Sequence, residues 1–169
     1  MEITLDELLA GRDKRQSVQR DLIRKSPQFT LICLTVIMPG RVKCNSQSLF
    51  IAKEAVSALK NQFQKSVRFF MERVLPTGFE AYLLTSTSLL ESKRKVCEIE
   101  EQHPLGRLFD IDVIDRDGNP VARAAIGKPE RRCLLCDNEA RYCMRAHSHT
   151  TEELLNHIKE LIDSYVQRL

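Results

Sequence analysis

The sequence lacks an apolar run long enough to cross a bilayer, for which about 18 consecutive apolar residues are needed. Its first seven residues are acidic and lack the basic-then-apolar order of a signal peptide. It also has little excess charge, since 26 Lys and Arg residues against 23 Asp and Glu residues give a net charge of +3. This balance is too mild to indicate a nucleic-acid partner. We therefore expect a cytoplasmic protein with neither a membrane nor a nucleic-acid partner.

Internal repeats, low-complexity tracts and linkers rich in Pro and Gly are missing as well. The chain contains neither the Gly-x-x-x-x-Gly-Lys-Ser/Thr loop nor the Gly-x-Gly-x-x-Gly fingerprint, which excludes both common phosphate-binding motifs. A length of 169 residues fits one domain. We predict a single domain over 1–169, with an α/β core over 29–126, a cysteine-rich loop over 129–150 and a C-terminal helix over 151–169.

Six cysteines are too few for a disulfide scaffold in a chain of this length, so we expect reduced thiols. Cys133, Cys136 and Cys143 fall within eleven residues and are followed by His147 and His149. A Cys-x2-Cys pair is the usual first half of a zinc knuckle. The second half is irregular, and His149 is the preferred fourth ligand because it directly precedes the final helix. Structural zinc, unliganded packing thiols and a redox or catalytic thiol all stay open.

Hydrophobic periodicity and turn residues predict the secondary structure. The expected elements are a helix over 4–25 interrupted at Gly11, a strand over 29–38, a helix over 46–64, strands over 67–75 and 81–85, a helix over 88–102, a strand over 108–114, an edge strand over 121–126 and a final helix over 150–168. Their order predicts an α+β fold whose antiparallel sheet has the split β-α-β, ferredoxin-like order. We expect helices on one face, an extra hairpin strand and flanking N- and C-terminal helices.

Asp110 and Asp112 lie two positions apart on the expected strand over 108–114. Because side chains alternate across a strand, both carboxylates point to one face. Mg²⁺ accepts one or two such carboxylates together with phosphate oxygens, and it neutralises a leaving diphosphate. The alternative is an acidic face exposed to solvent. However, both residues lie among apolar neighbours, where burying an unpaired carboxylate costs free energy. We take both as catalytic residues and Mg²⁺ ligands.

The segment before this strand adds His103, Gly106 and Arg107. They supply a titratable ring, a flexible loop position and a guanidinium whose geometry matches phosphate. We assign His103 and Arg107 to catalysis and Gly106 to substrate binding. His103 is either the proton acceptor or the residue that orients the Gly106 loop.

Four arginines could meet further phosphates through bidentate contacts. Arg12 and Arg15 are spaced as on one side of a helix, and Arg131 and Arg132 precede the cysteine pair. For each of them, solvated surface charge is the alternative. Glu80, where a turn enters a strand, either faces the same site or is an ordinary turn acid.

Several long motifs occur in the order expected for one family. They are Gly11-Arg12-Asp13-x-Arg15-Gln16, Pro39-Gly40, the run from His103 to Val113, Arg131-Arg132-Cys133-Leu134-Leu135-Cys136, and the run from Ala140 to Arg145 followed by His149. Together they resemble the apo-citrate lyase phosphoribosyl-dephospho-CoA transferases, also called citrate lyase holo-acyl-carrier-protein synthases. The resemblance covers about residues 4–160.

This resemblance implies a nucleotidyltransferase that acts on triphosphoribosyl-dephospho-CoA. The phosphoribosyl-dephospho-CoA group would pass to a serine of the citrate lyase acyl carrier (gamma) subunit, and diphosphate would leave. Such a reaction needs a metal-neutralised diphosphate and positive charge for the other phosphates. A different class of function also fits the cysteine cluster and the mild basic bias: a non-catalytic, zinc-stabilised module that binds a carrier protein or an RNA.

Overall fold

The computed structural model describes residues 1–168, so the last position of the predicted C-terminal helix, residue 169, lies outside the described residues. The chain forms helices α1 (Leu5–Lys25), α2 (Ser46–Phe63), α3 (Leu89–Gln102), α4 (Ala140–Ala146) and α5 (Thr151–Val166), strands β1 (Thr30–Val36), β2 (Val67–Leu75), β3 (Gly78–Thr85) and β4 (Phe109–Ile114), and short 3-10 helices η1 (Gln64–Ser66), η2 (Gly106–Leu108) and η3 (Arg123–Ile126). This composition confirms the predicted α+β class.

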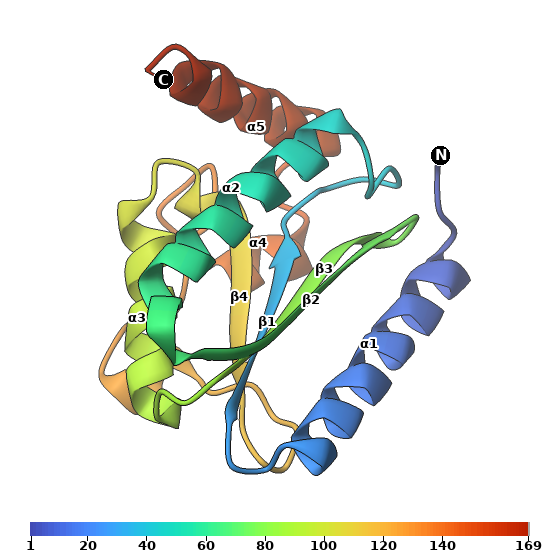
Figure 1. Ribbon diagram of the computed structural model, residues 1–169. Helices are drawn as coiled ribbons and strands as arrows, with labels where there is room; N and C mark the ends of the chain where they lie inside the picture. The colour runs from blue at the N-terminus through green and yellow to red at the C-terminus, as the bar shows by residue number, and fades with distance from the viewer. Residues whose placement is uncertain (169) are drawn as a thin grey trace.

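The four strands form one sheet in the order β2-β3-β1-β4, and every neighbouring pair is antiparallel. β1 is therefore central, which agrees with its run of apolar and β-branched residues. Strand β3 lies between β1 and β2, so the chain leaves the centre of the sheet through α2 and returns to it through the β2–β3 hairpin (Figure 1).

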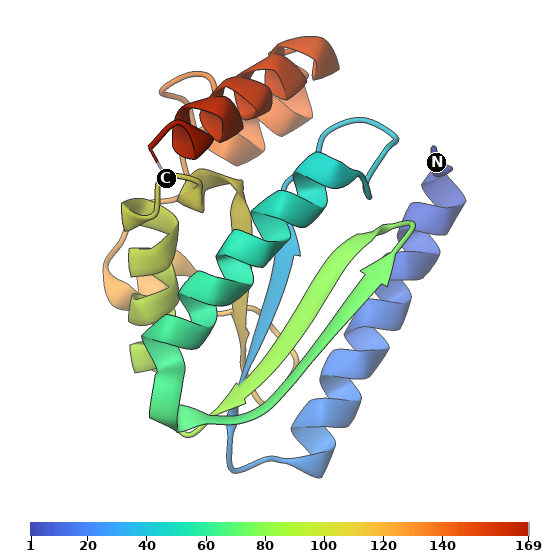
Figure 2. The same cartoon turned by 45° about the horizontal axis from the view of Figure 1, so that its top comes forward.

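One face of the sheet carries the main hydrophobic core. Ile32 and Leu34 of β1 and Ile111 and Val113 of β4 pack there against apolar residues of α2 and α3. Figure 1 shows these two helices beside the sheet. Helix α5 joins this layer, because its Ile158 belongs to the same cluster. Figure 2 shows α5 lying near one end of α2, at the same end of the molecule as η2.

The opposite face is covered by α1, so the expectation of helices on one face only is wrong. A smaller cluster there joins Leu31 and Cys33 of β1 to Val18 and Leu22 of α1. The predicted interruption at Gly11 is also wrong, because α1 is continuous from its Thr4 capping box to Lys25. A Cβ at Gly11 would lie 3.0 Å from the Thr77 hydroxyl, so glycine lets α1 approach the β2–β3 turn closely.

The extra hairpin strand over 121–126 is not formed. The Asp-Gly turn exists, with Gly118 at φ +85°, but pairing with β4 is limited to a bridge between Ile114 and Pro120 and one hydrogen bond from the Val121 N–H to the Val113 carbonyl. Pro120 has no N–H to extend the ladder. The chain then turns into η3, whose Arg123 forms an ion pair with Glu100 of α3 at 3.0 Å.

The cysteine-rich segment is more ordered than the predicted loop, since it contains the two-turn helix α4. Thr150 and Glu153 form the capping box that starts α5 where predicted. Within the described residues, none of the helices has the length and apolar character that a bilayer crossing needs.

Candidate functional site

The register of the sheet sets polar residues side by side on the face that α1 covers. Thr35 of β1 lies opposite Glu80 of β3 on one side and opposite Asp110 of β4 on the other. Cys33, two residues earlier in β1, lies opposite Asp112. Since alternate residues share a face, Asp110 and Asp112 point to the same side, as the strand pattern predicts.

A pocket of about 1230 Å³ opens over this part of the sheet, where β1 ends and β3 and β4 begin. It is lined by most of the predicted site residues: Arg12, Arg15, Glu80, Arg107, Asp110, Asp112, Arg131, Arg132, Cys133, Cys143 and His149. Its lining among the described residues also carries nine Lys and Arg side chains against seven Asp and Glu side chains. The net positive charge suits an anionic ligand.

Asp110 and Asp112 differ in their surroundings. Asp110 accepts hydrogen bonds from the Thr35 hydroxyl at 3.1 Å and from Arg131 at 3.3 Å. Burial raises the pKa of Asp112, and the like charge of Asp110 raises it further, while Lys93, Arg15 and Arg131 act against the rise. A divalent cation between the two carboxylates would offset this repulsion, so the pair fits the oxygen ligands that Mg²⁺ takes.

The Glu80 carboxylate is buried and contacts Tyr82, Arg15 and Arg73. It is only 4 % exposed and accepts a hydrogen bond from the Tyr82 hydroxyl at 2.7 Å. The guanidinium of Arg15 lies 4.0 Å from one of its oxygens, and that of Arg73 lies 3.7 Å from the other. These contacts fix Arg15 of α1 at the pocket wall, whereas the predicted Arg12 lines the pocket with an exposed side chain.

Arg131 and Arg132, which precede the first cysteine, are hydrogen-bonded to the start of β4 and the residues just before it. Arg131 donates to the carbonyls of Phe109 at 2.9 Å and of Arg107 at 3.1 Å, in addition to its bond with Asp110. Arg107 donates in return to the carbonyls of Arg132 and Cys133. The two motifs that stand apart in the sequence are thus joined by reciprocal arginine-to-backbone bonds.

His103 and Gly106 lie outside the pocket lining. The His103 ring packs on Phe109 and Tyr165, with ring centroids 4.9 Å and 5.5 Å apart, and its Nδ1 accepts from the Leu105 N–H at 3.1 Å. A Cβ at Gly106 would lie 2.5 Å from the Glu100 carbonyl oxygen, so this glycine permits the close turn after α3. The structure does not bring either residue to the carboxylates.

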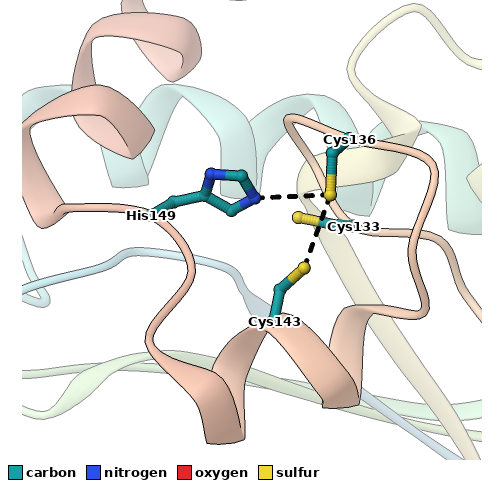
Figure 3. A group of neighbouring side chains, drawn as sticks. All are labelled: Cys133, Cys136, Cys143 and His149. Carbon is teal, nitrogen blue, oxygen red and sulfur yellow. Dashed lines mark hydrogen bonds between the residues drawn. The ribbon is translucent and has the colours of Figure 1, made fainter.

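Cys133, Cys136, Cys143 and His149 converge on one point (Figure 3). Their potential ligand atoms all lie within 4.8 Å of one another, and Cys136 Sγ lies 3.4 Å from both Cys143 Sγ and His149 Nε2. Burial opposes ionisation of Cys133, but hydrogen bonds from the backbone N–H groups of Leu135 and Cys136, together with those from the Cys143 and Cys136 thiols, outweigh it and lower the pKa of that thiol to about 7. Three thiols and one imidazole in this arrangement could bind a metal such as zinc.

Several residues of the pocket lining were not predicted as site residues, because no sequence pattern marks them. Lys93 and Glu100 of α3 and Arg123 of η3 line the same pocket. Lys93 and Glu100 are buried, although the helical pattern places charged residues on the solvent side. Only the packing of α3 along the edge of β4, where Glu100 accepts from the Ile111 N–H at 3.1 Å, brings them to the site.

A family model and several relatives with the same description match this chain. The family model described as "Apo-citrate lyase phosphoribosyl-dephospho-CoA transferase" matches residues 3–165. A probable apo-citrate lyase phosphoribosyl-dephospho-CoA transferase of Vibrio cholerae is 34% identical, covering 98% of this chain and 94% of the relative. A protein of the same description from Streptococcus pyogenes is 31% identical over 98% of this chain and 88% of its own length. The Escherichia coli O1:K1 transferase is 34% identical over 95% of this chain and 89% of its own length.

Proposed function

Because this chain belongs to the apo-citrate lyase phosphoribosyl-dephospho-CoA transferase family, we propose that it transfers that group from triphosphoribosyl-dephospho-CoA to a serine of the citrate lyase acyl carrier (gamma) subunit. The serine hydroxyl releases its proton to solvent as its oxygen forms a bond to the first phosphorus of the triphosphate, the bond from that phosphorus to the next bridging oxygen breaks, and diphosphate leaves with that bridging oxygen. The reaction is a nucleotidyl transfer that leaves a phosphodiester.

The observation that carries this proposal is the placing of Asp110 and Asp112 in a pocket with an excess of basic side chains. Asp110 and Asp112 would hold Mg²⁺, which supplies charge neutralisation for the leaving diphosphate. Arg15 and Arg131 line the same pocket and are suited to the remaining phosphates, together with the more exposed Arg12, Arg107 and Arg132.

Three predicted residues take supporting roles in this proposal. His103 orients the turn before β4 through its bond from the Leu105 N–H, which is the second of the two roles considered for it. Gly106 acts by allowing that turn to pack on α3. Glu80 holds Arg15 in place.

We include structural Zn²⁺ at Cys133, Cys136, Cys143 and His149 in the proposal, because their donor atoms suit tetrahedral zinc. A reducing compartment such as the cytoplasm keeps such thiols available as ligands. The zinc would fix the segment whose Arg131 contacts Asp110. In this proposal residues 1–169 act as one domain.

For the fold, we propose the split β-α-β, ferredoxin-like plan. It is supported by the position of β3 between β1 and β2 and by the antiparallel pairing throughout the sheet.

The test is to incubate the chain with the apo carrier subunit, triphosphoribosyl-dephospho-CoA and Mg²⁺, and then to measure the mass of the carrier. We expect a mass gain equal to the phosphoribosyl-dephospho-CoA group on one serine. No gain, together with tight binding of the carrier, would instead favour the non-catalytic module, which family membership does not favour.

A further inference from the structure

Lys93 is a buried cation that forms no ion pair or hydrogen bond with the described residues 1–168. It lies on α3, is only 5 % exposed and lines the pocket that contains Asp110 and Asp112. Its side of the helix is the one that also carries Cys97 and Glu100, which faces the edge of β4. Among the described residues, the ion pairs and side-chain hydrogen bonds of this region involve Glu100, Arg123 and Arg131 and do not include the Lys93 ammonium.

The half-buried cations of the pocket wall differ from Lys93 in this respect. Arg15 is held by Glu80, Arg123 by Glu100, and Arg131 by Asp110. Lys43 donates to the Met38 carbonyl at 2.6 Å. Each of these groups directly contacts a counter-charge or an acceptor, whereas Lys93 acts on Glu100 and Asp112 only through its charge.

The Lys93 ammonium must also reach the open space of the pocket. In the described part of the chain, every polar side-chain atom that is fully sealed from solvent has a hydrogen-bond partner. Since the ammonium has none, it cannot be one of the sealed atoms. An ammonium on a mostly buried stem that lines a pocket is stabilised by an anion that enters that pocket.

We propose that Lys93 binds a phosphate oxygen of the substrate and stays on the diphosphate as it leaves. This inference rests on the proposed transfer reaction and adds a substrate-binding residue to it. Arg131 touches Asp110, while Lys93 acts on Asp112 through its charge without contacting it, so the acidic pair has a cation beside each member. A lysine ammonium is a compact point charge that donates to phosphate oxygens without the planar geometry a guanidinium demands.

The first test uses inorganic diphosphate with Mg²⁺, titrated calorimetrically into the full chain. Lys93→Met should weaken diphosphate binding about 10- to 100-fold, as expected for loss of one charged hydrogen bond. Lys93→Arg should restore part of that affinity. Lys95→Met is the matched control, because Lys95 lies on the same helix, is not part of the pocket lining and contacts Gln62 and Phe63; it should bind like the wild type.

The outcomes separate this inference from the proposed function. If the wild type binds diphosphate and Lys93→Met binds it equally well, the role of Lys93 is refuted while the transfer proposal stands. If the wild type modifies the carrier yet Lys93→Met keeps full kcat/KM, the same conclusion follows. A wild type that neither binds diphosphate nor modifies the carrier would overturn the proposed function itself.

A second measurement uses the wild type alone, so that it holds even where Lys93→Met does not fold. The chain is treated briefly with an acylating reagent, with and without Mg²⁺ and diphosphate, and the modified lysines are located by mass spectrometry. Diphosphate should protect Lys93 several-fold and leave Lys95 unchanged. Equal labelling of Lys93 in both samples would refute the inference.

Discussion

The guanidinium of Arg131 lies 3.3 Å from the carboxylate of Asp110, and it joins the cysteine segment to the acidic strand. The same side chain donates to the carbonyls of Arg107 and Phe109 at the start of β4. Two residues later, Cys133 begins the group of possible metal ligands. A change in the position of Cys133 can therefore shift Arg131 and, through it, the Asp110 carboxylate.

Asp110→Asn should abolish transfer while leaving the fold intact. The amide keeps the size of the side chain and can still accept from Thr35, but it removes the negative charge that would bind Mg²⁺. The mass of the carrier subunit measures transfer, and thermal unfolding checks the fold. Asp117→Asn makes the same chemical change in the exposed turn after β4 and should keep full activity. Full activity of Asp110→Asn would remove the metal hypothesis.

Cys136→Ser should lower zinc content, thermal stability and transfer together. Cys136 Sγ is close to both Cys143 and His149, so its loss breaks the centre of the proposed ligand set. We expect the melting temperature to fall by at least about 2–4 °C, the shift that 1 kcal/mol makes in a chain of this size. Elemental analysis should find one zinc per wild-type chain and little in the variant.

Cys44→Ser is the control for this prediction, because Cys44 is outside the cysteine group. It should retain both zinc and activity. If the purified wild type carries no zinc, and adding zinc raises neither its stability nor its activity, the thiols only pack against one another and the zinc proposal is wrong.

The local part of this site was predictable from the sequence. The two-residue period of a strand places Asp110 and Asp112 on one face, and the spacing of Cys133 and Cys136 indicates a shared ligand position; both are properties of neighbouring residues. The structure shows the predicted arrangement of the two aspartates, because both lie on β4 and line the same pocket. The central β1 strand was found for a similar reason, since its composition is that of a strand buried on both faces.

The remaining features depend on contacts between distant segments. Lys93 and Glu100 look like solvent-facing charges on a helix, and only the packing of α3 on the edge of β4 buries them. The predicted edge strand over 121–126 does not form. Pro120 has no N–H to donate to the β-ladder, and Arg123 instead forms an ion pair with Glu100. His103 stood close to the aspartates in the sequence, but the turn through η2 directs its ring toward Tyr165.

Gly106→Ala should destabilise the protein strongly. An added Cβ would lie 2.5 Å from the Glu100 carbonyl oxygen and 2.6 Å from that of Ile99, and these backbone atoms cannot move aside as a flexible side chain could. We expect a loss of about 2–4 kcal/mol in the free energy of unfolding, measured by urea denaturation. Gly118→Asn is the control, since its side chain would enter open space and Asn tolerates positive φ. A loss below about 1 kcal/mol in Gly106→Ala would contradict the close packing.

His103→Asn should flatten the pH dependence of stability and leave transfer largely intact. Burial lowers the pKa of His103 below its usual value of 6.5, with Glu54 acting weakly against the shift. The unfolded chain therefore takes up the proton first as pH falls, so this residue removes stability as pH drops through about 6.5 and toward the lower pKa of the folded chain. Asn can still accept from the Leu105 N–H but does not titrate. Melting temperatures from pH 8 to pH 5 should thus fall less steeply in the variant than in the wild type. Loss of transfer with an unchanged pH profile would instead make His103 the proton acceptor.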